Sequence, residues 1–202
     1  MTRLRNPVTG LFASKQDLGI KKMMTQMLGA AKFSADTFNQ LRDDHSATLQ
    51  SVILVPIVGL CYGLGLGLFG FFVAGFSFNE TIVVTVLSLA SAATIALIWS
   101  AANFLIVTRL FNRTISYPDL TRPFLFSWTP GILFILLSSP IPIVSEGLRI
   151  LATAWVGVAS IFALRHAGGL SIQQSMLAFI ISILILVFAQ IVFESLLPLL
   201  FT

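Results

Sequence analysis

Charged side chains are scarce in this sequence, and their scarcity excludes most soluble folds. Only 10% of the 202 residues are charged, against about 25% in an average soluble domain. Four stretches contain neither a charged residue nor a histidine, and each is longer than the ~20 apolar residues that span a bilayer. They lie between His45 and Glu80, between Glu80 and Arg109, between Arg122 and Glu146, and between His166 and Glu194. The composition therefore predicts an integral membrane protein.

Residues that could perform chemistry are equally few. The single cysteine, Cys61, allows neither a disulfide within the chain nor a metal cage, and both histidines, His45 and His166, are expected at the membrane surface. The sequence has no H-E-x-x-H, no phosphate-binding glycine loop, no G-x-S-x-G and no paired acids in mid-membrane. We therefore expect no enzyme, no cofactor and no nucleic-acid partner. The 18 phenylalanines and the small-residue faces leave room for a bound lipid or apolar pigment.

The apolar stretches predict an all-α fold, a polytopic bundle of five transmembrane helices preceded by a short interfacial helix. Helices are expected because they satisfy their backbone hydrogen bonds within the segment that crosses the membrane. The predicted spans cover residues 48–76, 81–108, 124–144, 147–164 and 171–193. The fourth is close to the minimum length for a crossing. Residues 1–45 form a separate N-terminal segment, and residues 46–202 form the transmembrane domain.

The distribution of lysine and arginine sets the expected orientation, because cytoplasmic loops are enriched in both. With the N-terminus inside, eleven of the twelve basic residues lie on the cytoplasmic side, and only Arg149 faces outward. Glu80, Glu146 and Glu194 then mark outer helix ends, and the C-terminus lies outside. The N-terminal segment has no early apolar core, so no cleaved signal peptide is expected. The location expected is an inner or plasma membrane.

The first 45 residues hold no core of their own, but they contain helical patterns. In SKQDLGIKKMMTQMLGAAKF the apolar residues recur at helical spacing beside lysines, a pattern that can lie on an anionic leaflet. A solvated tail that obeys the positive-inside rule is the alternative. Ser34 is expected to cap a short helix over Ala35–Asp43, and Ser46 is expected to cap the first span.

Glycines recur at close intervals in the first span. Gly59, Gly63 and Gly67 lie four residues apart, and Gly70 continues the same strip in PIVGLCYGLGLGLFG. Small residues at this spacing let two helix backbones approach closely, which favours helix association in lipid. The second span, rich in alanine and serine, is a natural partner. The pattern allows packing within the chain and packing between subunits.

The stretch SYPDLTRPFLFSWTPGILF, residues 116–134, changes from polar to apolar and predicts where the third span enters the membrane. Tyr117 and Trp128 are expected at the headgroup level, where aromatic rings are enriched. Arg122 is the last basic residue of the connection between the second and third spans. Pro123 suits the first turn of the helix, because its missing N–H has no helical partner there. Pro130 lies deeper and is expected to kink the helix or to end a short lead-in helix.

A second signature joins the fourth and fifth spans, in WVGVASIFALRHAGGLSIQQ. Arg165 and His166 end the fourth helix, and His166 is interpreted as a capping residue at the surface. Gly168 and Gly169 are expected to adopt positive φ values, and Ser171 is expected to cap the fifth helix. The connection is so short that the two helices must run antiparallel.

Only a few polar side chains fall inside the predicted spans. Asn103 is expected to form a hydrogen bond between helices. Gln190 and Glu194 lie near the outer end of the fifth span, where Glu194 can reach water or join a polar contact with a partner subunit. Asp119 and Arg122 are three residues apart and can form an exposed pair, which contributes about 0–1 kcal/mol.

These segments together resemble the Yip family of polytopic membrane proteins. The resemblance rests on the aromatic and proline-rich stretch at 116–134, on the tryptophan-containing fourth helix with its basic turn before Gly-Leu-Ser, and on the lead-in FSADTFNQLRDDHSATLQSVILV. It covers most of residues 33–200, and the lead-in is similar to that of prokaryotic members. The resemblance implies five spans with the N-terminus inside. The acidic N-terminal region of eukaryotic members, with its D-L-Y-G-P motif, is missing, so Rab binding does not carry over.

These observations predict a non-enzymatic membrane protein that acts through helix packing, as a scaffold or accessory subunit of a larger assembly or in membrane organisation. Its expected partners are the lipid bilayer and other membrane-protein subunits. A small transporter or channel component is the alternative, and it requires a water-accessible polar path through Asn103, Gln190 and Glu194. Five spans with one proline-rich stretch do not divide into the two related halves typical of transporters.

Overall fold

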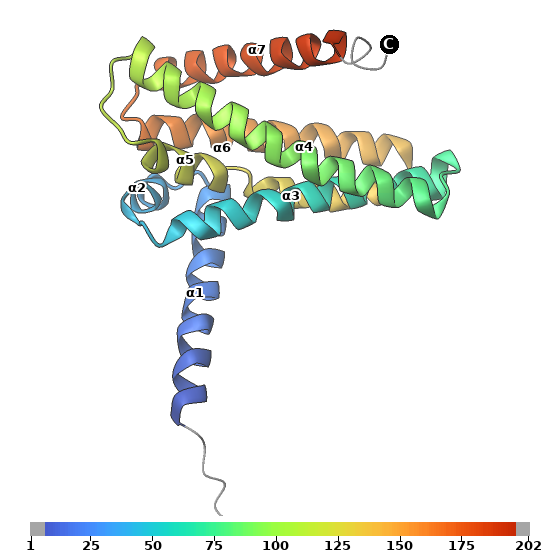
Figure 1. Ribbon diagram of the computed structural model, residues 1–202, viewed down its shortest axis with the longest axis horizontal. Coiled ribbons are helices and arrows are strands. Elements are labelled where there is room, and N and C mark those ends of the chain that lie inside the picture. The colour runs from blue at the N-terminus through green and yellow to red at the C-terminus, as the bar shows by residue number, and fades with distance from the viewer. Residues whose placement is uncertain (1–6, 197–202) are drawn as a thin grey trace, which may run out of the picture.

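The computed structural model describes the backbone of residues 7–196 and the side chains of residues 19–191. Within these limits the fold is all-helical, and five segments are long and apolar enough to cross a membrane. The predicted all-α fold with five candidate spans is therefore confirmed. Figure 1 shows most of the long spans running in roughly one direction, with helix α1 (Pro7–Ala31) standing crosswise to them.

Four of the spans match predicted segments, three of them closely. They are α3 (Ala47–Phe69) continued by the π-helical turn η1 (Gly70–Ala74), α4 (Phe78–Leu105) continued by the π-helical turn η2 (Ile106–Leu110), α6 (Pro142–Ala167) and α7 (Ile172–Leu196). The fourth span is longer than expected, with 26 residues in α6. It begins at Pro142, a first-turn position where the missing N–H of proline leaves no helical bond unmade.

The third span differs from the single helix predicted over 124–144. It consists of helix α5 (Tyr117–Phe126) and, after a short turn, the 3-10 helix η3 (Thr129–Ser138). The expected break near Pro130 is present, because proline cannot donate the backbone bond that would continue α5. The expected start was wrong: Pro118 takes the first-turn position and Pro123 lies inside α5.

Two helices precede the first span. The last turns of α1 reach the bundle, and α2 (Ala35–Asp43) lies against α5. The hydroxyl of Ser34 accepts a hydrogen bond from the backbone N–H of Thr37 at 3.4 Å, so the expected cap and bounds of α2 are confirmed. Ser46 does not cap α3, because its backbone is already helical and its hydroxyl donates to Asp44 at 2.6 Å.

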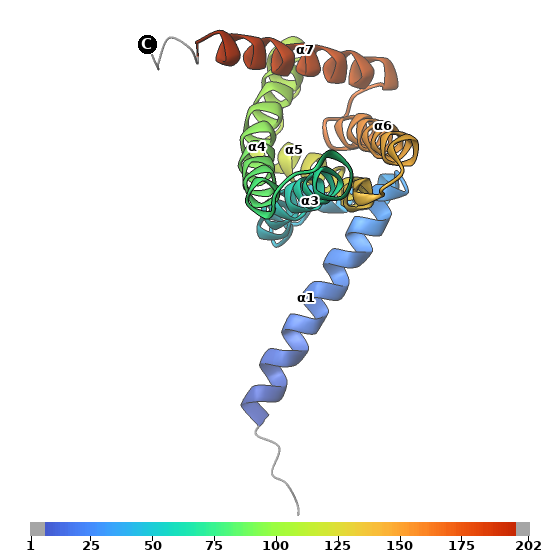
Figure 2. The ribbon, with the colours of Figure 1, turned by 90° about the vertical axis from the view of Figure 1, so that its right-hand side faces the viewer.

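We name the two ends of the bundle by their landmarks. The α5 end contains α2, the start of α5 and the turn between α6 and α7, whereas the η1 end contains the connection from α3 to α4. Figure 2 looks along the bundle and shows α4 and α6 on opposite sides, with α3 below and α7 across the top. The buried apolar cluster lies toward the α5 end. Toward the η1 end α7 diverges from the other spans (Figures 1 and 2).

Candidate functional site

Gly59, Gly63 and Gly67 place α3 directly against α4. A Cβ atom on Gly63 would stand 2.8 Å from the Cα of Thr85, and one on Gly59 would stand 2.6 Å from the Cβ of Ala92. Side chains do not approach so closely, so glycine is what allows the two backbones to lie at this separation. The partner of this glycine face is therefore a helix of the same chain.

Gly70 does not face α4, contrary to the expectation. The chain reverses just after η1, and the ring of Phe76 fills the space beside Gly70 instead. A different glycine, Gly65, faces η3, where a Cβ would collide with the backbone carbonyl of Phe134. The repeat of four residues could not reveal this contact, because Gly65 lies off the repeat. Glycines thus hold α3 closely against two neighbours.

Arg122 and Asp119 form an ion pair where the third span begins, but it is not the exposed pair that was expected. The Arg122 side chain is 1% exposed and the Asp119 side chain 29% exposed, because α2, α3, α4 and α6 surround α5. Arg122 Nε also donates to the carbonyl oxygen of Pro118 at 3.0 Å. Arg122 Nη1 has no hydrogen-bond partner among the described residues. A buried charge of this kind depends strongly on its counter-ion.

The aromatic rings of this stretch lie mostly in the protein interior. Trp128 is buried, with its ring centroid 5.8 Å from that of Trp99. The ring of Phe124 packs on the indole of Trp99 at 5.3 Å. Trp128 lies in the turn after α5, and its ring is covered by protein rather than exposed to the headgroups as expected. Tyr117 is exposed, and its hydroxyl forms a 2.6 Å hydrogen bond with that of Ser100.

The turn between α6 and α7 brings its predicted residues together, with one difference. Gly169 has a φ of +61°, whereas the φ of Gly168 is −80°, so the positive φ expected at Gly168 was wrong. The constraint there is space, since a Cβ would stand 2.6 Å from the carbonyl oxygen of Leu164. Ser171 accepts the backbone N–H of Gln174 at 3.2 Å, and the Gln174 side chain accepts the N–H of Ser171 at 3.0 Å. This reciprocal arrangement is a capping box at the start of α7.

Arg165 and His166 end α6 in different surroundings. Arg165 is exposed, whereas His166 is half-buried, with its ring stacked on Phe38 of α2 at 6.4 Å and on Phe162 of α6 at 6.2 Å. The interpretation of His166 as a surface cap missed this contact between two helices. Phe33 stacks on Phe162 at 5.4 Å. Aromatic rings therefore fasten the N-terminal helices to α6.

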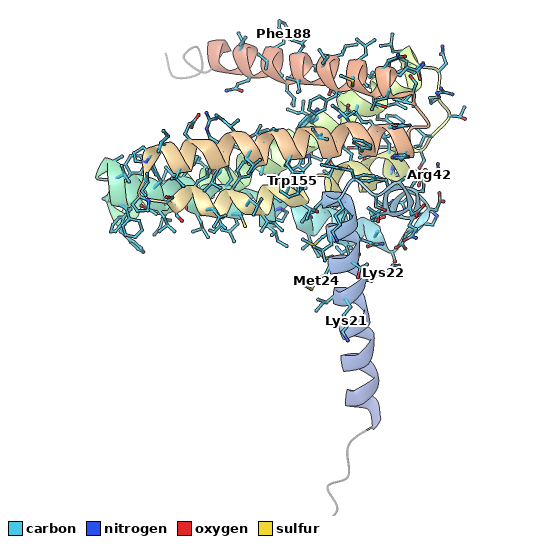
Figure 3. The ribbon with its side chains drawn as sticks, turned by 180° about the vertical axis from the view of Figure 1, so that it is seen from behind. Lys21, Lys22, Met24, Arg42, Trp155 and Phe188 are labelled. Atoms are coloured by element: carbon cyan, nitrogen blue, oxygen red, sulfur yellow. The ribbon has the colours of Figure 1, made fainter. Side chains whose placement is uncertain are left out.

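Asp44 and Trp155 hold α1 against the bundle, and neither was predicted to do so. The Asp44 carboxylate pairs with Lys22 at 2.6 Å and accepts a hydrogen bond from Gln26 at 3.2 Å. Burial by itself would raise the pKa of Asp44, but its hydrogen bonds, from Lys22 above all, outweigh burial and lower the pKa to about 2. The indole N–H of Trp155 donates to the carbonyl oxygen of Ala31 at 2.8 Å. Figure 3 shows Trp155 where α1 meets the bundle.

The three residues of the predicted polar path are not brought together. Asn103 lies near the α5 end, buried, and its amide donates to the carbonyl oxygen of Trp99 in its own helix at 3.0 Å. Gln190 is exposed near the opposite end, about 27 Å along α7 from Ile172 at ~1.5 Å per residue. The side chain of Glu194 lies outside the described residues. The transporter alternative thus has no shared polar path in the described part of the chain.

A lateral cavity of about 480 Å³ lies among the spans. Its walls come from α3, α4, η3, α6 and α7 and are almost entirely apolar, with Trp99 and Trp128 at one end. Residues from five separate segments form it, so no local sequence pattern could locate it. Among the described residues there is no group of three side chains able to ligate a metal.

The fold and these contacts define a multi-pass integral membrane protein. The family model described as the Yip1 domain matches residues 30–193. The chain therefore belongs to the Yip1 domain family, whose members are generally non-enzymatic trafficking proteins. The narrower resemblance to prokaryotic members stays a prediction. No match was found among curated proteins or among solved structures.

Proposed function

We propose that this protein works by contact, as a scaffold or accessory subunit of a larger membrane assembly, rather than by catalysis. The observation that carries the proposal is the position of α1. This helix leaves the side of the bundle near the α5 end and projects away from the spans (Figures 1 and 2). A helix placed in this way enlarges the surface that the protein offers to membrane and partners without enlarging its core.

The α5 end faces the cytoplasm in this proposal. Arg109, Arg113 and Arg165 lie there, and Lys21 and Lys22 lie on α1, which leaves the bundle near this end, whereas Arg149 lies toward the η1 end. This distribution fits the positive-inside rule. The N-terminus is then inside and the C-terminus outside, in the inner or plasma membrane of a prokaryotic cell.

Helix α1 then lies along the cytoplasmic leaflet. Its side chains Ile20, Met24 and Leu28 are 54%, 58% and 59% exposed and follow one stripe, four residues apart. Lys21 is exposed beside this stripe, and Figure 3 shows Lys21 and Met24 projecting from α1. An apolar stripe flanked by lysines suits the boundary between acyl chains and anionic headgroups. Residues 1–45 thus act as the interfacial segment and residues 46–202 as the transmembrane domain.

A groove between α4 and α7 is the proposed contact for a partner subunit. It is lined by Ala101, Ala102 and Ile185, among others, and small residues let a neighbouring helix approach closely. Farther along α7, Phe188 is 68% exposed, and Figure 3 shows it on the side of α7 that faces away from the bundle. The divergence of α7 leaves this groove accessible from the lipid.

Photocrosslinking in the native membrane tests this contact. A photoreactive amino acid replaces Ala101 in one variant and Ala90 in a control, which is also exposed on α4 but lies outside the groove. We expect a protein adduct of one discrete mass from position 101 and lipid adducts from position 90. Lipid adducts alone at both positions would contradict a partner in this groove.

A further inference from the structure

We propose that the lateral cavity binds one acyl chain of a membrane lipid. Its volume of about 480 Å³ falls within the ~300–1,000 Å³ usual for small-molecule sites. Only a few hydroxyl groups, including those of Ser88 and Ser91, interrupt the apolar walls. The inference is independent of the scaffold function proposed above.

The depth of the cavity restricts what can fill it. All of its walls belong to the candidate spans. Along α4 it reaches from Val84 to Trp99, about 22 Å at ~1.5 Å per residue. That length exceeds half of the ~30 Å hydrocarbon thickness. Apolar cavities do not hold water, and the hydrocarbon layer supplies none. The occupant is therefore an apolar group that comes from the bilayer.

Aromatic side chains close the cavity toward the α5 end. The ring of Trp99 packs against Trp128 at 5.8 Å and against Phe179 at 5.7 Å. Its indole N–H donates to the hydroxyl of Ser182 at 2.8 Å, which fixes α7 over this floor. Beyond that contact α7 diverges (Figures 1 and 2). A closed, apolar end of the cavity fits the methyl end of a lipid chain and excludes the headgroup.

The mouth of the cavity opens onto the lipid-facing surface. Ser91 of α4 and Thr153 of α6 line the cavity and are also exposed, so they mark its rim. Leu87, which continues the wall on α4, is 60% exposed. A chain can therefore enter sideways without leaving apolar surroundings. A partner helix, about 10 Å across, would need more than the available 480 Å³ for two turns.

Quenching of tryptophan fluorescence by brominated lipid tests the proposal. Of the three tryptophans in the chain, Trp99 and Trp128 line the cavity and Trp155 does not. The Trp155→Phe protein is reconstituted into phosphatidylcholine vesicles with or without bromine on the acyl chains. Trp128 is 6% exposed, so lipid outside the bundle does not reach it. We expect a roughly two-fold loss of intensity, because a bound chain contacts both indoles.

Matched variants show whether the quenching comes from the cavity. Ser91→Phe fills the mouth and should restore most of the lost fluorescence. Ala93→Phe, also exposed on α4 but outside the cavity, should leave the quenching unchanged. Native mass spectrometry of the Trp155→Phe protein without a further substitution should show one retained lipid per chain. This measurement does not depend on whether the two phenylalanine variants fold.

Three results would overturn the proposal: absence of quenching in the Trp155→Phe protein, equal quenching in the two phenylalanine variants, or absence of a retained lipid. A dry cavity and a cavity filled by a partner's side chains both give unquenched fluorescence. The proposed partner contact fails on a different result, the lack of a protein adduct at position 101, so the two failures can be told apart.

Discussion

The indole nitrogen of Trp155 donates a 2.8 Å hydrogen bond to the carbonyl oxygen of Ala31, joining the middle of α6 to the last residue of α1. Carbonyl groups in the last turn of a helix lack partners within the helix, so the indole satisfies one of them. The ion pair between Lys22 and Asp44 adds a second attachment. These two contacts hold α1 crosswise to the spans.

Replacing Trp155 with phenylalanine should loosen α1 without unfolding the bundle. The variant keeps an aromatic ring but loses one hydrogen bond, which is worth about 1 kcal/mol. Backbone amides in the last turns of α1 should then exchange with solvent roughly five-fold faster. Hydrogen exchange measured by mass spectrometry provides the test, with the amides of α7 as the internal control. Unchanged exchange in α1 would show that the bond does not hold the helix.

The attachment through Asp44 should depend on pH only in acid. Its folded pKa of about 2 lies below the ordinary value of 3.8. The carboxylate therefore stabilises the docked helix above pH 3.8, and this contribution is lost as the pH falls through about 2. Distances between spin labels on α1 and α6 should be constant between about pH 5 and pH 8. A transition near neutrality would contradict this account.

Asp44→Asn should loosen α1 between about pH 5 and pH 8, because it removes the charge that pairs with Lys22. Asp43→Asn is the matched control. Its carboxylate is exposed and pairs with Arg42, whose hydrogen bond lowers the pKa of Asp43, so α1 should stay docked. The same spin-label distances distinguish the two variants, and equal behaviour would argue against a specific role for Asp44.

Asp119→Asn should destabilise the protein more than any other neutralisation of an acid among the described residues. It leaves the guanidinium of Arg122, 1% exposed, without its counter-ion, and breaking a buried pair in this way costs about 3–5 kcal/mol. Adding Arg122→Met should recover most of the loss, since the double variant has no buried charge. Thermal unfolding in detergent measures both effects. A double variant no more stable than Asp119→Asn would assign the loss to something other than the unpaired charge.

Gly63→Ala should weaken the contact between α3 and α4. Its new Cβ would stand 2.8 Å from the backbone of Thr85, and overpacking of this kind costs about 1–3 kcal/mol. Gly147→Ala is the control, because Gly147 is helical with nothing within 4 Å of the added atom. That substitution should be neutral or stabilise by up to about 1 kcal/mol. Equal unfolding temperatures for the two variants would contradict the close approach at Gly63.

Local features of this fold could be predicted from the sequence. Charge-free stretches locate the spans, because lipid tolerates few unpaired charges. Ser34 and the bounds of α2 follow from helix-cap chemistry, and the break near Pro130 follows from the missing N–H of proline. Each of these depends on residues close together in the chain.

Features that depend on which helices surround a residue could not be predicted. A tryptophan beside a proline and a polar run suits the headgroup level as well as a buried core, and only the helices around α5 decide that Trp128 is inside. For the same reason Arg122 was expected in an exposed ion pair but is buried, because four helices surround α5. Gly168 and Gly169 look alike in sequence, although crowding constrains the first and a positive φ the second.

The native mass of the protein in its own membranes tests the central claim most directly. The membranes are extracted in mild detergent, and the chains that migrate with the protein are identified by mass spectrometry. We predict a species much larger than the 22.0 kDa chain, with partner chains in fixed proportion. A lone chain or a small homo-oligomer, in extracts where known membrane complexes stay intact, would contradict the proposal that this protein acts as part of a larger assembly.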